Sequence, residues 1–162
     1  MTLIPIAGDR IRLREWRADE VDGMHRWIGN PEVMRFLSWG SANRDDTIRH
    51  LEFIVKEQSA KPRTRYFLAI ELNDSSRTIG DAGFTWVSSG SAEIGYFLEP
   101  EYWGRGLGVE AARMIIDLAF NLGANEVQAN CFAENTHSER IMIACGMSSI
   151  ATEDPLIRRY RL

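Results

Sequence analysis

The chain has 162 residues, of which 44% are hydrophobic and 26% are charged, a composition typical of a globular protein. This length predicts one domain, residues 1–162, that buries about 70% of the surface exposed by the unfolded chain. The formal net charge of −4 predicts no basic face, so nucleic acid is not an expected partner, and no run approaches the ~20 apolar residues that span a membrane.

The first half of the chain is predicted to hold one strand and several helical segments. Residues 10–16 alternate polar and apolar side chains with the period of a half-buried strand. The segments that follow are a helix at 18–27, a helical turn at 32–36, a loop at 37–43 with an exposed Trp39, and a helix at 47–59 capped by Asp45 or Asp46.

The second half is predicted to be richer in strands. Short turns separate strands at 66–72, 78–86 and 92–98, which predicts an antiparallel meander. A glycine turn, a helix and a strand at 126–132 follow, and this last strand should run parallel to 92–98. The predicted fold is therefore α+β, with a mostly antiparallel mixed sheet that splays at one parallel pair and is flanked by helices. A helix at 136–145 and two segments at 148–152 and 156–162 complete the chain.

Three glycines at alternate positions, Gly104, Gly106 and Gly108, mark the start of the central helix. Backbone without Cβ atoms adopts unusual angles and lies close to a ligand. The first N–H groups of a helix have no intrahelical partner and lie at the positive end of its dipole, which favours a phosphate or pyrophosphate. A tight turn without a ligand is the alternative.

The polar side chains of this helix fall on one stripe. Between Gly106 and Leu122, spacings of three and four residues place them on a single face, and the remaining positions are apolar. The stripe consists of Glu110, Arg113, Asp117 and Asn121. We therefore expect the helix to be covered on most sides and its N-terminus to be held rigidly.

A second polar stretch, Ala133–Arg140, follows the parallel strand. Thr136 and Glu139 have the spacing of a capping box, and Gly146 follows the helix in the position of a C-terminal cap. Asn135 and Ser138 are expected at the mouth of the splayed sheet. Ordinary turn and helix-start chemistry is the structural alternative for both.

Together these stretches resemble the GNAT acyl-CoA N-acyltransferases. The resemblance lies in Glu-Ile-Gly-Tyr-Phe-Leu-Glu-Pro-Glu-Tyr-Trp-Gly-Arg-Gly-Leu-Gly at 93–108, Asn135-x-x-Ser138-x-Arg140 and Cys-Gly-Met at 145–147. It covers essentially the whole chain and is similar to the branch of ribosomal-protein N-terminal acetyltransferases (RimJ/RimL type). One departure is Trp103, where the family often has Arg or Gln at the start of its pyrophosphate signature.

The resemblance implies an acetyl-CoA-dependent N-acetyltransferase acting on a protein or peptide N-terminus or a small amine. Main-chain amides would hold the pyrophosphate, further main-chain groups would pair with pantetheine, Asn135 would bond the pantetheine arm, and Ser138 would protonate the departing thiolate. The main-chain groups are those of Arg105, Gly106, Leu107, Gly108 and Val109 for the pyrophosphate, and of Phe97 and Leu98 for pantetheine.

Acyl transfer from a thioester to an amine requires a neutral amine and a place for the thiolate charge. Glu93, on the strand before the glycine turn, is the first candidate for deprotonating and binding the acceptor, and Asp81 is the second. A solvated carboxylate is the structural alternative for Glu93. Trp39 is a candidate wall of the acceptor pocket, or an aromatic anchor of its loop. No metal-ligand spacing occurs, so no metal is expected.

Two other classes stay open. Gly106-x-Gly108-x-x-Ala111 satisfies a dinucleotide fingerprint, although only 54 residues follow Gly108 and a meander precedes it. A non-catalytic acyl-CoA sensor of the same fold is the other alternative. Cys131 and Cys145 are too few for a disulfide framework and indicate buried thiols in a reducing compartment. A cytoplasmic protein without membrane partners, monomeric or homodimeric, is expected.

Overall fold

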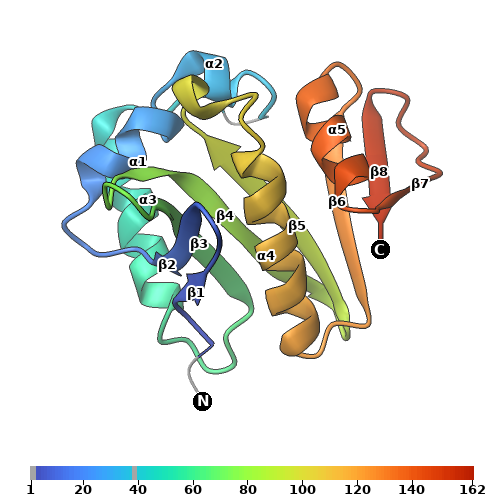
Figure 1. The fold of residues 1–162 in the computed structure, drawn as a ribbon, viewed down its shortest axis with the longest axis horizontal. Coiled ribbons are helices and arrows are strands. Elements are labelled where there is room, and N and C mark those ends of the chain that lie inside the picture. The colour runs from blue at the N-terminus through green and yellow to red at the C-terminus, as the bar shows by residue number, and fades with distance from the viewer. Residues whose placement is uncertain (1–2, 38–39) are drawn as a thin grey trace.

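A computed structural model describes residues 3–37 and 40–162. Eight strands form one sheet in the order β1-β2-β3-β4-β5-β6-β8-β7 (Figure 1). Only β5 and β6 pair in parallel, and the other neighbours pair antiparallel among the described residues. This confirms the mixed sheet expected from the sequence. The strands are β1 Ile6–Ala7, β2 Ile11–Glu15, β3 Arg65–Leu72, β4 Thr78–Ser88, β5 Ser91–Leu98, β6 Glu126–Phe132, β7 Ser148–Ile150 and β8 Ile157–Arg161.

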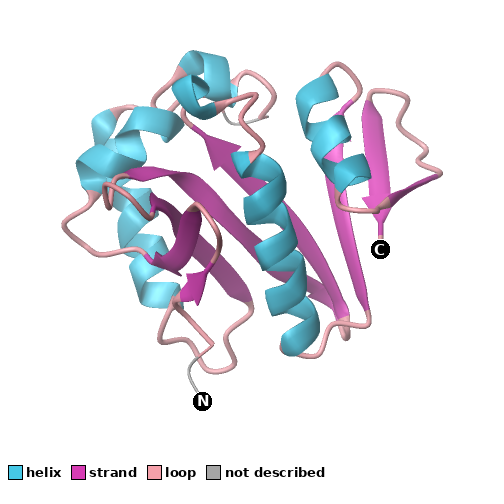
Figure 2. Ribbon diagram, viewed as in Figure 1, coloured by secondary structure: helices cyan, strands magenta, loops and turns pink. Residues whose placement is uncertain are grey.

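Helices cover the two faces of the sheet unequally (Figure 2). Helix α4 packs on one face in a large apolar core, and α1 and α3 pack with the other face of the sheet in a second core around Trp16 and Trp27. The helices are α1 Val21–Ile28, α2 Pro31–Met34, α3 Arg44–Glu57, α4 Leu107–Asn121 and α5 Thr136–Ala144, with a 3-10 turn at Pro100–Tyr102. No helix in the described ranges is long and apolar enough to cross a membrane.

The thin polar stripe predicted for α4 is confirmed. Arg113, Asp117 and Asn121 are exposed, Glu110 is half-buried, and nine residues of the helix are buried. Phe120 departs from the pattern because 37% of it is exposed next to the stripe. The covered helix fixes the direction in which its N-terminus points.

Two predicted helix caps are wrong. Helix α3 begins at Arg44 with Asn43 as its cap, and Asp46 completes a capping box at the third position instead of capping the helix. The predicted box of Thr136 and Glu139 does not form either. Asn135 caps α5 by accepting the Ser138 N–H at 3.1 Å, and Glu139 accepts the Tyr160 hydroxyl at 2.6 Å. In both helices the asparagine directly before the first helical residue accepts a hydrogen bond from a free N–H group of the first turn, and so takes the place of the predicted cap.

The end of α5 follows the prediction. Gly146 has a positive φ of 84°, its N–H donates to the Ile143 carbonyl, and the Met147 N–H donates to the Met142 carbonyl. This pair of hydrogen bonds is a Schellman motif. Strand β1 is an addition that the sequence did not predict.

Strands β5 and β6 separate after a short parallel start. Their register runs only from Ser91 opposite Glu126 to Glu93 opposite Gln128. Figure 1 shows the two ribbons meeting at one end and spreading apart toward the other. We call the unpaired remainder, residues 94–98 and 129–132, the β5–β6 divergence. It begins one residue past Glu93.

Candidate active site

Helix α4 begins at a glycine turn that no side chain caps. Gly104 and Gly106 have φ values of 69° and 78°, and Gly106 is the N-cap residue without a side-chain hydrogen bond. A Cβ atom on Gly104 would meet nothing within 4 Å. The N–H groups of Leu107, Gly108 and Val109 come first in the helix and have no intrahelical acceptor. The turn therefore presents free donors at the positive end of a buried helix.

The third glycine, Gly108, is required for a different reason. A Cβ atom on Gly108 would lie 2.8 Å from the Ile141 side chain of α5. Gly108 thus permits α5 to pack closely beside the start of α4. This contact holds the second polar stretch next to the glycine turn.

An ion pair that the sequence analysis missed ties the turn to β2. The Arg10 guanidinium donates to Glu110 at 2.9 Å and to the Arg105 carbonyl at 2.7 Å. The Arg10 N–H also donates to Glu110 at 2.8 Å. Burial raises the pKa of Glu110, but these hydrogen bonds outweigh it and hold the pKa below its usual range. No local sequence pattern links residues 10 and 110, so only the tertiary structure reveals this ion pair.

The departure at Trp103 has a structural role. Its indole N–H donates to the Leu98 carbonyl at 2.8 Å and so fixes the end of β5. Arg105 is exposed, and its guanidinium lies 5.5 Å from the centre of the Tyr102 ring. The Arg105 cation therefore lies over Tyr102, in the turn that leads into α4.

The main-chain groups of Phe97 and Leu98 point to opposite edges of β5. The Glu99 N–H donates to the Ile79 carbonyl, and Phe97 pairs with Asp81 in the same register. Because antiparallel bonding alternates, the groups of Phe97 are used by β4, and those of Tyr96 and Leu98 face the β5–β6 divergence. Pairing of Phe97 and Leu98 with pantetheine stays a prediction, and this geometry favours the Leu98 N–H, because the Leu98 carbonyl accepts the Trp103 indole N–H.

On the α4 side of the divergence, Tyr96 meets Ser138. Their hydroxyl oxygens are 3.0 Å apart, and the Tyr96 hydroxyl also lies 3.1 Å from the Ser138 carbonyl. Burial raises the pKa of Tyr96 well above its usual range, so the phenol stays protonated. Asn135 uses its side-chain oxygen on the Ser138 N–H, which leaves its amide hydrogens free within the described residues. Strand periodicity could have identified Tyr96, three residues after Glu93 and therefore on the opposite face.

The thiols lie on the same side. Cys131 is buried, and burial raises its pKa above the usual range, with the same effect at the half-buried Cys145. Both cysteines are free. They behave as the small buried groups that the sequence predicts.

On the other face of the sheet, Glu93 lies at the start of the divergence. Its Oε2 accepts hydrogen bonds from Asn130 Nδ2 at 2.7 Å and from Gln128 Nε2 at 3.0 Å. Asn130 in turn accepts from Arg159 Nε at 2.8 Å. Within the described residues Oε1 of Glu93 has no partner. The carboxylate is therefore oriented by one oxygen and open at the other.

Asp81, the second candidate base, lies on β4 on the same face, opposite Phe97 and so four residues past Glu93 in the register, but under α1. It is 4% exposed, and its Oδ2 accepts the Trp16 indole N–H at 2.7 Å. Burial raises its pKa to about 7, although the bond from Trp16 opposes the shift. The structure thus separates the two candidates by access.

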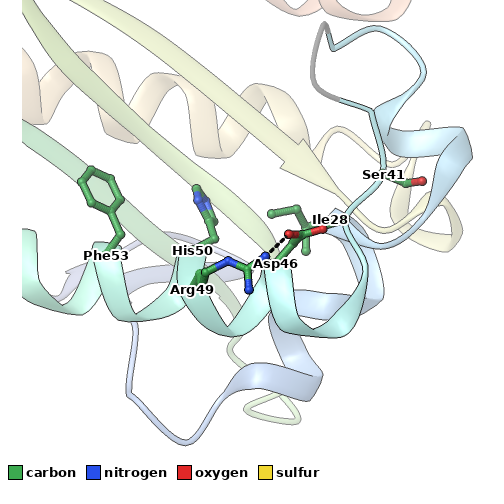
Figure 3. A pocket seen from close by; sticks show the side chains of 7 residues that line it. Ile28, Ser41, Asp46, Arg49, His50 and Phe53 are labelled. Carbon is green, nitrogen blue, oxygen red and sulfur yellow. Dashed lines mark hydrogen bonds and ion pairs between the residues drawn. The ribbon is translucent and has the colours of Figure 1, made fainter.

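A pocket of about 480 Å³ lies beside α3 (Figure 3). Asp46, Arg49, His50 and Phe53 line it from α3, with Ile28, Ser41 and Ala42 from α1 and the segment before α3. Its lining includes none of the groups described at the divergence. Trp39, predicted to wall the acceptor pocket, is outside the described residues. Those residues contain no cluster of three or more His, Cys, Asp or Glu side chains suited to a metal ion.

Comparison with known proteins gives one family match. Residues 10–148 match the acetyltransferase (GNAT) domain. Among curated proteins, the uncharacterized N-acetyltransferase p20 of Bacillus licheniformis is 27% identical over 137 residues, which are 83% of this chain and 76% of that protein.

Two solved structures illustrate the similarity of the fold. The RimL ribosomal L7/L12 alpha-N-protein acetyltransferase in complex with coenzyme A has a TM-score of 0.83 at 14% identity, covering 97% of this chain and 96% of that one. The microcin C7 self-immunity acetyltransferase MccE in complex with acetyl-CoA and AMP has a TM-score of 0.80 at 17% identity, covering 96% and 93%. At these identities the likeness establishes architecture only.

Proposed function

The chain belongs to the acetyltransferase (GNAT) domain family, and from that premise we propose that it transfers an acetyl group from acetyl-CoA to a primary amine in a ternary complex. The fold of acyl-CoA N-acyltransferases, expected from the resemblance, is confirmed. We further propose an acceptor amine on a peptide or protein N-terminus or on a small molecule. Membership of the RimJ/RimL branch, which the motifs suggest, is part of this proposal.

One observation carries the proposal: an uncapped N-terminus of α4 next to the β5–β6 divergence. Gly106 starts the helix with a positive φ and no side-chain cap. The N–H groups of Leu107, Gly108 and Val109 would bind the diphosphate, and the exposed Arg105 side chain of the same turn would add a cation. The main-chain groups of Tyr96, the Leu98 N–H and the amide of Asn135 would bind the pantetheine arm.

The coenzyme supplies an acetyl thioester that is already activated toward amines, so no protein nucleophile is required. The residues of the chain manage two protons. Glu93 Oε1, open in the structure, would accept the proton that the ammonium of the acceptor must lose. The new N–C bond would form as the C–S bond breaks, and the nitrogen would then release a second proton, which balances the proton that the thiolate takes up.

The second proton goes to the departing thiolate. Ser138 and Tyr96 share a hydrogen bond on the α4 side of β5, opposite Glu93. Burial weakens the phenol as an acid but keeps it protonated, and the pair would donate to the thiolate as its charge develops. In this proposal Glu93 would act from one face of the divergence and the Ser138–Tyr96 pair from the other.

Calorimetric titration with acetyl-CoA, NAD and ATP tests the cofactor class. We expect acetyl-CoA to bind and the two nucleotides to show no comparable affinity. A protein without affinity for acetyl-CoA would contradict the proposal. Thiol release across peptides with free N-termini and small amines then tests catalysis. Binding without thiol release for any amine would favour the sensor alternative.

A further inference from the structure

The sheet face opposite α4 carries a chain of polar side chains across β5, β6 and β8. Glu93, Asn130 and Arg159 each come from a different strand, and hydrogen bonds of 2.7 and 2.8 Å join them through the Asn130 amide. All three are half-buried. They lie where β5 and β6 separate, because the parallel pairing ends with Glu93 opposite Gln128. An acidic and a basic group are thus held in fixed positions at the start of the β5–β6 divergence.

Arg159 differs from the other half-buried arginines of the chain. Arg14 is paired with Glu20 and Glu71, and Arg63 is paired with Glu15. Within the described residues, Arg159 has no carboxylate within 4.0 Å, and its Nε is the nitrogen that binds Asn130. A guanidinium oriented through Nε presents its two outer nitrogens as a fork suited to a carboxylate. No group of the described chain takes that place.

Gly95 leaves room between these groups and the body of the sheet. A Cβ atom on Gly95 would meet only the Phe97 ring, at 4.0 Å, so the local structure does not require a glycine there. Its cross-strand partner Gly83 is different, because a Cβ atom there would lie 2.0 Å from the Tyr66 carbonyl oxygen. Gly95 lies on the same face as Glu93, two residues along β5. Its missing side chain keeps the space next to Glu93 open.

We propose that the acceptor is a primary amine with a carboxylate a few bonds away, its ammonium at Glu93 Oε1 and its carboxylate at the outer nitrogens of Arg159. This assignment rests on the proposed acetyl transfer and specifies its substrate class. Two hydrogen bonds and one amide group place Glu93 Oε2 within about 8 Å of Arg159 Nε, and Oε1 and the outer nitrogens lie at most about 2 Å further out at each end. An α-amino carboxylate with a hydrogen bond at each end spans about the same distance. A free amino acid and an acidic N-terminal residue of a peptide share this chemistry.

Matched acceptors test the charge requirement. With saturating acetyl-CoA, thiol release is measured for free α-amino acids against their α-amides, and for Asp-Ala-Ala-amide against Asn-Ala-Ala-amide. We expect the acid of at least one pair to exceed its neutral partner about tenfold in kcat/KM, as for one charge-assisted contact. The pair that shows the preference identifies the source, amino acid or peptide. Equal rates within both pairs would overturn the proposal.

Matched variants test the residues. Arg159→Gln should raise the acceptor KM about tenfold and abolish the preference for the acid, with the KM for acetyl-CoA unchanged, and Arg159→Lys should restore part of it. Arg158→Gln is the control, since this neighbour is exposed, lies on the other face of β8 and also has no carboxylate partner in the described chain. Melting temperatures of the three variants exclude misfolding.

Gly95→Ala adds a second readout, namely a lower kcat/KM for the acceptor without a loss of thermal stability. Arg159→Gln indistinguishable from Arg158→Gln would overturn the assignment even if acetyl transfer is robust. Absence of acetyl-CoA binding and of transfer to any amine would instead refute the proposed function, and this inference with it.

Discussion

Glu93 and Asp81 project from neighbouring strands on one face of the sheet, yet their surroundings are opposite. Glu93 is half-buried, four residues before Phe97, on whose ring Trp27 of α1 stacks, and two amide side chains bind one of its oxygens. Asp81 is 4% exposed and lies under α1 against Trp16. Its pKa, raised to about 7 by burial, is the value that suits a base at neutral pH. Access, however, favours Glu93.

The comparison teaches that a shifted pKa can report burial alone. A general base must reach the proton that it removes, directly or through one water. Asp81 is covered by Trp16 and the α1 layer, whereas Glu93 borders the β5–β6 divergence. We therefore assign the chemistry to the open part of the face, and four predictions test this assignment.

The largest effect is expected for Glu93→Gln, which keeps the size of the side chain and removes its basicity. We expect kcat to fall about 10²–10⁴-fold, the contribution of a positioned base, with acetyl-CoA affinity unchanged. Steady-state kinetics and calorimetry measure the two quantities. Glu126→Gln is the control. Glu126 is the first residue of β6 and lies on the same face as Glu93, but its carboxylate is bound by Arg161. Unchanged turnover in Glu93→Gln would refute the assignment.

Asp81→Asn should affect stability and leave turnover within a few-fold of the parent. The folded pKa of Asp81 exceeds its unfolded value, so the folded protein keeps the proton between about pH 4 and 7 while the unfolded chain loses it. The free energy of unfolding contributed by Asp81 therefore falls as pH rises through that window. Relative to the parent, the variant should gain on the order of 3 kcal/mol across it.

Denaturant unfolding at several pH values measures that gain. A constant difference between the two proteins from pH 4 to 7 would show that Asp81 does not titrate in this way. A loss of turnover as large as that in Glu93→Gln, with binding intact, would reverse the comparison of the two carboxylates.

Gly106→Ala tests whether the glycine turn binds the diphosphate of the coenzyme, as a coenzyme that delivers its acetyl group near Glu93 requires. The positive φ of 78° should cost about 1–2 kcal/mol of stability for alanine, and acetyl-CoA affinity should fall about tenfold as the N–H groups shift. Gly123→Ala is the matched control at the other end of α4, where φ is 102° and a Cβ atom meets nothing within 4 Å. Equal acetyl-CoA affinity in the two variants would contradict a diphosphate site at Gly106.

The smallest effect is expected for Ser138→Ala, on the opposite side of β5 from Glu93. Turnover should fall about tenfold with acetyl-CoA still bound, because the Tyr96 hydroxyl remains as a proton donor. A double-mutant cycle with Tyr96→Phe should show non-additive losses, since the two hydroxyls share one hydrogen bond. Strictly additive losses of turnover in the double variant would show that Ser138 and Tyr96 act independently, which would contradict a shared role as the acid.

Local patterns in the sequence predicted much of the fold. The strand predicted at 126–132 and the helical spacing after Gly106 matched β6 and α4 closely, and the positive φ values of Gly104 and Gly106 fit the turn expected there. The caps of α3 and α5 were missed because an asparagine competes with Asp45, Asp46 and Thr136 for the same N–H groups. Asn and Asp have nearly the same preference for the N-cap position, so the sequence alone does not show which of several adjacent residues caps the helix.

By itself, the sequence determined the order of elements from β2 onward, the glycine turn and the family resemblance, because these depend on residues close together in the chain. Only the tertiary structure decided that Asp81 is covered and Glu93 is open, that Arg10 binds Glu110, and that Tyr96 meets Ser138. Strand periodicity assigns a side chain to a face, but it does not say which helix covers that face. Contacts between residues 42 to 100 positions apart form only when the whole sheet and its helices pack together.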